Sequence, residues 1–317
     1  MPTIEVKPDV FSYVYSPYLE PVAVVKPGDD VIVYTEDAVE SRIKTKADLP
    51  KKALANATSL NPQTGPIYVE GAEPGDTLAV TIKSIEFTRD FAFSAFMDKY
   101  GSLSGGVIAG SSLMDAPMLE EEVFIWKVVD DGKAFYEEDL DIKLPAAPFF
   151  GTFGVAPALE AISSFTPGRF GGNMDCLDVC AGNTIYLPVY KPGALFYIGD
   201  CHGAQGQGEI CGFALEITAK GHLQFDIIKN KSIKWPRVES PDKIMVVGSA
   251  APMEIAGKIA YTHLIDWMAS DYGFTKGEAY QLLTQAGGLY VTQMVDSLHT
   301  LVASIEKKYL KRCKDSK

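Results

Sequence analysis

The side chains of this sequence that could do chemistry are concentrated in one stretch, residues 170–216. Polar residues stand there on glycine-rich turns between apolar, strand-like runs, and loops held by a β scaffold are where proteins commonly expose functional groups. The polar candidates are Asn173, Asp175, Asp200, His202, Gln205 and Glu209. We therefore take the rest of the chain as the framework that positions this stretch.

One histidine and several carboxylates in this stretch could bind a metal ion. A neutral imidazole nitrogen is the commonest metal ligand that proteins supply, and carboxylate oxygens beside it suit Zn²⁺ or another divalent cation. His202, with Asp175, Asp200 and Glu209, is such a ligand set. Their spacing matches no known metal signature, and Asp200 and His202 share one face only if a strand runs through both. A metal site and a hydrogen-bonded structural cluster therefore both remain open on spacing alone.

The cysteines are poor candidates for a catalytic nucleophile. Cys201 and His202 are adjacent, so in a strand their side chains point to opposite faces. Cys176, Cys180 and Cys211 have apolar neighbours, where a buried and unreactive thiol is the usual state. The odd total of five cysteines, without close pairing, also argues against disulfides and for a reducing compartment.

Composition limits the classes of protein to which the chain can belong. A length of 317 residues with 47% hydrophobic content can bury a sizeable core in one large or two modest domains. The formal net charge of −12 argues against nucleic acid, because binding phosphates requires a concentrated positive field. The first residues lack the pattern of a secretion signal, and no apolar stretch approaches the roughly 20 residues that span a membrane. We expect a cytoplasmic protein with neither a nucleic-acid nor a membrane partner.

Residues 10–90 have the pattern of β-strands separated by turns. Residues 21–35 and 67–83 each read as strand, turn, strand, with β-branched side chains in the strands and Pro-Gly-Asp in the turn. Such hairpin-like units are common in sandwiches and barrels. Further strands are expected at residues 123–129 and 133–143.

Asp37 and Glu70 each follow a strand in this region. Each has two interpretations, a solvated turn residue or a carboxylate that the end of a strand presents to a site.

The last part of the sequence has helical patterns. Residues 252–268 place apolar side chains at the spacing of one buried helix face, and Thr275 and Glu278 form a capping-box pattern that opens a second helix through residue 283. Residues 299–306 are expected to form a last strand, with a continuing helix as the alternative.

Five motifs of this sequence, in this order and spacing, resemble those of the acetamidase/formamidase family. The resemblance extends from about residue 10 to about residue 305. The motifs are TGPIYVEGAEPGD at 64–76, GVAP at 154–157, TPGRFGGNMD at 166–175, YLPV at 186–189 and GALFYIGD at 193–200.

The resemblance implies a fold and an activity. The fold would be mainly β, a jelly-roll-like sandwich with an associated α+β portion and C-terminal helices. Residues 1–317 would form a single family unit, with a β-rich portion at 1–150 and a site-bearing portion at 151–317. The activity would be hydrolysis of small linear amides such as formamide or acetamide, giving ammonia and a short carboxylate. The protein would assemble as a homodimer or a higher homo-oligomer.

The resemblance also implies roles for individual residues. A divalent ion, with zinc as the first candidate and calcium as the second, would be held by His202, Asp175 and Asp200, and would polarise the amide carbonyl and activate a water. Glu209 would be the general base, and Asn173 or a glycine backbone N–H would stabilise the oxyanion. Glu70 would assist catalysis or orient the ligands. The substrate would be contacted by Asp37, Gln205 and Phe170. A metal-free variant, with histidine and carboxylate alone as acid and base, stays open.

Two positions depart from the pattern expected for the family. Phe170 stands where a histidine is expected before Gly-Gly-Asn, and Gln207 stands where an aspartate is expected before Gly-Glu. Both changes remove a group that could bind a metal or carry a proton. They motivate a rival hypothesis, a non-catalytic or substrate-diverged protein that binds small molecules on the same scaffold.

Overall fold

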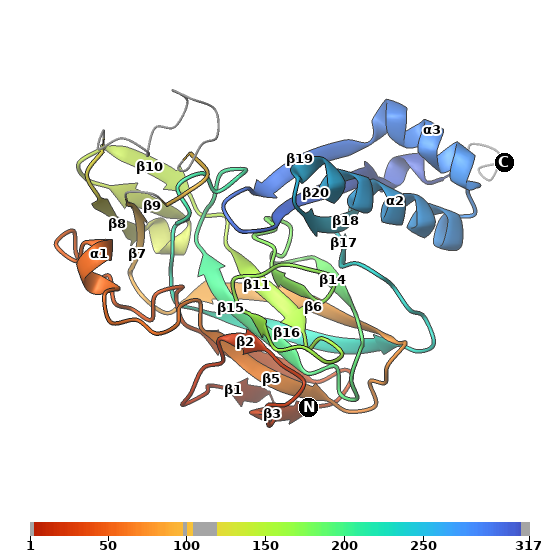
Figure 1. The fold of residues 1–317 in the computed structure, drawn as a ribbon, viewed down its shortest axis with the longest axis horizontal. Helices are drawn as coiled ribbons and strands as arrows, with labels where there is room; N and C mark the ends of the chain where they lie inside the picture. Colours follow the sequence, from red (N-terminus) through yellow and green to blue (C-terminus); the bar gives the residue numbers. More distant parts are fainter. Residues whose placement is uncertain (1–2, 98–99, 104–118, 312–317) are drawn as a thin grey trace.

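The computed structural model describes residues 3–97, 100–103 and 119–311, and within these residues the protein is mainly β (Figure 1). The mainly β class expected from the sequence is therefore confirmed. The largest sheet has nine strands, in the order β1 (Ile4–Val6), β4 (Asp30–Thr35), β16 (Ala219–Ile228), β6 (Thr77–Phe87), β14 (Thr184–Pro188), β17 (Arg237–Glu239), β18 (Lys243–Ala250), β20 (His299–Glu306) and β19 (Gly288–Gln293).

A five-stranded sheet packs face to face against part of the large sheet. Its strands, in order, are β13 (Gly171–Asn173), β11 (Phe149–Val155), β15 (Phe196–His202), β5 (Gln63–Val69) and β3 (Ala23–Val25). Every residue of β11 and β15 is buried, as expected for strands covered on both faces. The rings of Phe196 in β15 and Phe225 in β16 lie 5.3 Å apart and join the two sheets through a shared apolar core.

The alternation of side chains in β4 shows why this sequence forms a strand of the sandwich. Val31 and Val33 are fully buried, whereas Asp30, Ile32 and Tyr34, which alternate with them, are partly exposed. A period of two puts successive side chains on opposite faces, so that one face of β4 enters the core.

The two units with Pro-Gly-Asp turns are strands joined by a turn, as expected, but they are not hairpins. β3 pairs with β5 in the smaller sheet, whereas β4 pairs with β1 and β16 in the larger one. β5 and β6 are likewise divided between the two sheets. Each turn therefore carries the chain from one sheet of the sandwich to the other.

Two smaller elements stand beside the sandwich. A four-stranded antiparallel sheet, at the upper left of Figure 1, has the order β10 (Ile142–Pro145), β9 (Ala134–Glu137), β8 (Glu122–Val129) and β7 (Phe91–Phe96). The strand expected at 133–143 is thus two strands. A short pair joins β12 (Ile162–Ser163) to β2 (Val14–Tyr15).

Helices cover the far end of the large sheet, at the upper right of Figure 1. α2 (Met253–Tyr272) packs on β18 and β20, and it comes so close that a Cβ at Gly248 would lie 2.4 Å from the carbonyl oxygen of Ala256. α3 (Lys276–Ala286) begins with the expected capping box at Thr275, and β20 confirms the expected last strand. A one-turn helix, α1 (Pro50–Ala53), carries its proline in the first turn. Among the described residues, no helix has the length and apolar character to cross a membrane.

Candidate functional site

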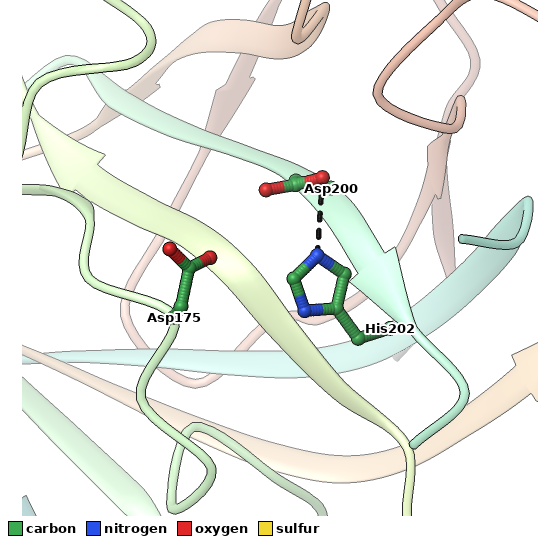
Figure 2. Close-up of side chains that lie close together, drawn as sticks. All are labelled: Asp175, Asp200 and His202. Carbon is green, nitrogen blue, oxygen red and sulfur yellow. Dashed lines mark ion pairs between the residues drawn. The ribbon is translucent and has the colours of Figure 1, made fainter. Parts of the chain in front are cut away.

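Strand β15 brings Asp200 and His202 to one face, as the sequence analysis required. The strand runs through both residues, and Nε2 of His202 lies 3.3 Å from Oδ1 of Asp200 (Figure 2). Cys201, between them, is buried on the other side, where burial raises the pKa of its thiol. This is the environment of an unreactive cysteine, as expected.

A glycine in the neighbouring strand β11 makes room for these side chains. A Cβ at Gly151 would lie 2.5 Å from Oδ1 of Asp175, 2.8 Å from Oδ2 of Asp200 and 3.1 Å from Cε1 of His202. Gly151 also accepts a hydrogen bond from the backbone N–H of Asp175, at 3.0 Å. The three predicted metal ligands therefore gather over the backbone of one residue, which only glycine can supply.

Three of the carboxylate-bearing candidates have a positive φ angle. Asp175, Asp200 and Glu209 have φ angles of +45°, +58° and +47°. This left-handed region is uncommon for residues other than glycine, and such conformations cluster at functional sites because the surrounding structure must enforce them.

A hydrogen-bond network fixes Asn173. Its Oδ1 accepts hydrogen bonds from Oγ1 of Thr152 at 2.7 Å and from Nδ2 of Asn61 at 3.2 Å, and its Nδ2 donates to Oδ2 of Asp296 at 2.9 Å. The amide is thus oriented from both ends. Its NH₂ group has a second hydrogen beyond the one that Asp296 accepts.

Gln205 determines the tautomer of His202. The Nε2 amide group of Gln205 donates to the carbonyl oxygen of Thr292 at 2.9 Å, so its Oε1 faces Nδ1 of His202, 2.8 Å away. An amide oxygen only accepts, and Nδ1 must therefore carry a proton. Nε2 of His202 is left facing Asp200 and Glu216, whose Oε1 lies 3.5 Å from it.

These polar groups line a cavity of about 410 Å³. Asn173, Asp175, Asp200, His202 and Glu209 from the sequence analysis all reach it. Glu216 and Asp296, which the sequence analysis did not single out, line it as well. The structure thus gathers five carboxylates and one histidine in one small space.

The electrostatics follow from burying these charges together. Burial would lower the pKa of His202, but the carboxylates of Glu216 and Asp200 raise it to about 10. Burial raises the pKa of Glu216 to about 8 and that of Asp296 to about 7. Without a further positive charge, part of this cluster holds protons near neutral pH.

The carboxylates at the centre of the cavity are short of partners. Within the described residues, both side-chain oxygens of Asp175 and Oε2 of Glu216 are buried and accept no hydrogen bond, while Oδ1 of Asp200 faces the imidazole of His202 at 3.3 Å. Burial, and next the carboxylate of Glu209, raise the pKa of Asp175 well above its usual value. Buried polar oxygens without partners are costly, so the arrangement suits a cation that these oxygens would coordinate.

Two groups of residues have ligand atoms close enough to share one ion. One is Asp175, Asp200 and His202, and the other is His202, Glu209 and Glu216; within each group the ligand atoms lie within 4.8 Å of one another. The imidazole and carboxylate donors are those that zinc and similar divalent ions accept. The cluster is therefore compatible with a divalent metal.

Asp37, Glu70 and Phe170 were also expected at the site, but none of the three lines the cavity. Glu70 is on the surface, with a side chain 49% exposed and 3.8 Å from Lys26. Asp37 is fully buried, and its Oδ2 lies 2.7 Å from Arg89. Phe170 packs in the core with its ring 5.0 Å from that of Tyr15. These positions suit a solvated turn residue, a buried ion pair and a core side chain rather than contacts with a substrate.

Glu216 and Asp296 differ in how far the sequence could have revealed them. Glu216 ends the stretch in which the other polar candidates lie, and its carboxylate after the apolar run 213–215 was a usable signal. Asp296 follows β19, more than 120 residues after Asn173, and no local motif surrounds it. Only the pairing of distant strands brings it to the cavity.

Comparison with known proteins shows to which family this chain belongs. The model of the acetamidase/formamidase family matches residues 6–166 and 158–305. This chain belongs to that family. It is 24% identical to a formamidase of Methylophilus methylotrophus over 265 residues, which cover 70% of this chain and 65% of the relative. It thus spans less than two thirds of that formamidase's length.

Further members of the acetamidase/formamidase family are similar in sequence and in structure. The acetamidase of Mycolicibacterium smegmatis is 26% identical over 289 residues, covering 75% of this chain and 70% of the relative. A crystal structure of an acetamidase from Yersinia enterocolitica matches with a TM-score of 0.91 at 39% identity, covering 98% of this chain and 93% of that one.

The two departures from the pattern expected for an acetamidase/formamidase do not face the cavity. Phe170 is a core residue, and Gln207 is exposed on the turn before Glu209. Neither change removes a group from the cluster of carboxylates around His202.

Proposed function

We propose that this protein hydrolyses the carbon–nitrogen bond of small amides, in which an amide and water give a carboxylic acid and ammonia. The observation that carries the proposal is the set of unpartnered, buried carboxylate oxygens around His202, inside a cavity that a small molecule can enter. Membership of the acetamidase/formamidase family supports the same reaction class. A cytoplasmic location and a homodimer or higher homo-oligomer remain predictions.

The residues around the cavity fit a divalent cation. Asp175, Asp200 and His202 would hold it, with Glu216 beside them, because these groups offer unpartnered oxygens and an imidazole nitrogen. Such a cation supplies Lewis acidity, which polarises a carbonyl and makes a nearby water easier to deprotonate. Zinc is our first candidate and calcium the second, since zinc accepts imidazole nitrogen and carboxylate oxygen together.

The imidazole ring of His202 has a fixed orientation in the cavity. Gln205 holds its Nδ1–H, so the ring cannot rotate without breaking a hydrogen bond of 2.8 Å. This fixes the direction of Nε2 into the cavity. Gln205, expected to contact the substrate, instead acts through the histidine in our proposal.

Glu209 moves the proton in this scheme. The cleavage of an amide requires that water lose a proton and that the departing nitrogen gain one. Glu209 lies buried at the cavity wall, and burial raises the pKa of its carboxyl well above the usual value. A carboxyl with a raised pKa can both accept that proton and deliver it to the nitrogen.

Asn173 is placed to stabilise the negative charge that develops on the carbonyl oxygen. Its amide is locked by Thr152 and Asp296, and its remaining N–H is a donor at the cavity wall. Removing one such donor in other enzymes costs about 100- to 1,000-fold in turnover.

The test is ammonia release from short amides, together with elemental analysis of the purified protein. Ammonia should form with wild type, and His202→Ala and Glu209→Gln should each lower turnover by at least about 100-fold. Glu160→Gln, the same change at an exposed residue outside the cavity, is the matched control and should have no effect. No ammonia from any amide would refute the reaction, and full turnover in either site variant would refute that residue's role.

A further inference from the structure

The cavity has a polar side and an apolar side. The carboxylates, His202 and Asn173 form the polar side. Apolar or aromatic side chains from the segments that follow α1, β7, β15 and β19 form the other. Six of these are Leu54, Leu60, Met97, Tyr100, Phe213 and Val295.

The cavity is much larger than the shortest amides. Its volume is about 410 Å³, and a water molecule occupies about 30 Å³ in the liquid. Formamide and acetamide have three and four non-hydrogen atoms, so each takes the space of about three or four waters, roughly a quarter of the cavity. The remaining space borders apolar side chains, where water finds few hydrogen-bond partners and an apolar group binds better.

The charges decide which end of an amide faces which side. During hydrolysis the nitrogen gains a proton and leaves as ammonia or ammonium, which the carboxylates of Glu209, Glu216 and Asp296 stabilise. The carbonyl oxygen, where negative charge develops, belongs near the N–H donor of Asn173. The acyl substituent is then the group left to face Leu54, Phe213 and the rest of the apolar side.

We infer that the preferred substrates are primary amides with an apolar acyl group of about five to eight carbons, rather than formamide or acetamide. This inference rests on the proposed amide hydrolysis and names its substrate class. The size follows from filling most, but not all, of the volume of about 410 Å³ at about 30 Å³ per non-hydrogen atom. Aromatic acyl groups of similar size, such as phenylacetyl, belong to the same class.

The test is a series of straight-chain primary amides from formamide to octanamide, with phenylacetamide added, in which ammonia release gives kcat/KM. Burial of each methylene group should raise kcat/KM about fourfold, so that hexanamide, with four more methylene groups, exceeds acetamide by about 250-fold. A maximum at formamide or acetamide would overturn the inference. That result would leave amide hydrolysis intact, whereas ammonia from none of the amides would refute the reaction itself.

A pair of variants tests whether the apolar side sets this preference. Leu54→Trp puts a larger side chain against the cavity, and Leu159→Trp makes the same change at a residue that is 70% exposed. The hexanamide-to-acetamide ratio of kcat/KM should fall at least tenfold in the first and stay unchanged in the second. An unchanged ratio in a folded Leu54→Trp protein would overturn the inference. If Leu54→Trp does not fold, the wild-type series decides alone.

Discussion

Replacing Gly151 by alanine tests whether the backbone of β11 sets the positions of the central side chains. The added methyl group would lie 2.5 Å from Oδ1 of Asp175 and 2.8 Å from Oδ2 of Asp200, both closer than any ordinary contact. Because neither carboxylate can remain where it is, the variant perturbs the geometry of the site without removing a functional group.

The expected magnitude follows from these distances. Asp175 must retreat by about 0.9 Å to reach an ordinary contact distance, and a displacement of about 1 Å at a reacting centre can lower turnover about 100-fold. Inserting one carbon into a packed interior also destabilises a protein by about 1–3 kcal/mol. For a chain of this length that corresponds to a fall in Tm of about 2–5 °C.

The assay is kcat/KM for ammonia release from the best amide, with Tm measured on the same samples. Gly277→Ala is the matched control, since a Cβ at that position in α3 meets nothing within 4 Å. The control should keep full activity and gain slightly in stability, as expected for alanine in a helix. A Gly151→Ala variant within threefold of wild-type activity and with unchanged Tm would refute the packing argument.

Three further changes address residues at the edge of the site or outside it. Glu70→Ala should leave the rate of ammonia release within twofold of wild type and change the free energy of unfolding by no more than about 1 kcal/mol, because it breaks only an exposed ion pair. A large loss of turnover would show that Glu70 has a role in catalysis. Asp37→Asn leaves Arg89 without its buried charged partner and should cost about 3–5 kcal/mol in the free energy of unfolding measured by denaturant titration; a loss below about 1 kcal/mol would contradict the role of this ion pair. In metal-free protein, Asp296 has a pKa raised by burial from 3.8 to about 7, so its contribution to stability is full below pH 3.8 and is lost as pH rises through about 7. Asp296→Asn should therefore flatten the fall in Tm over that window, and an equally steep fall in the variant would contradict the assignment.

The parts of the site that lie close together in sequence were predictable. Asn173 ends the short strand β13 and Asp175 follows it, and Asp200 and His202 share β15, so a local motif was enough to group them. The two strands are neighbours of β11 in one sheet, which explains why the groups converge. The same logic applied to Glu70 failed, because the end of a strand can face solvent or a site, and local sequence does not distinguish the two.

Features of the fold that depend on pairing between strands far apart in the sequence were not predictable. The Pro-Gly-Asp turns specify a local reversal of the chain, but not which sheet the next strand joins, and so β3 and β4 were expected to pair and do not. Phe170 lies in a site motif, yet its aromatic ring finds a place against Tyr15 in the core. A large aromatic ring gains free energy when it is buried in the core, and this decided the position of Phe170 although the residue belongs to a site motif.

The hydrogen bond between Asn173 and Asp296 also bears on how the protein is made. It joins residues 123 positions apart, and ribosomes add about 5–20 residues per second. A nascent chain would therefore carry Asn173 for about 6–25 seconds, and Glu209 for about 4–17 seconds, before Asp296 exists. During that interval the pocket lacks one wall and the strands that support it. Each newly synthesised molecule should become competent only after the hairpin of β19 and β20 has emerged and docked.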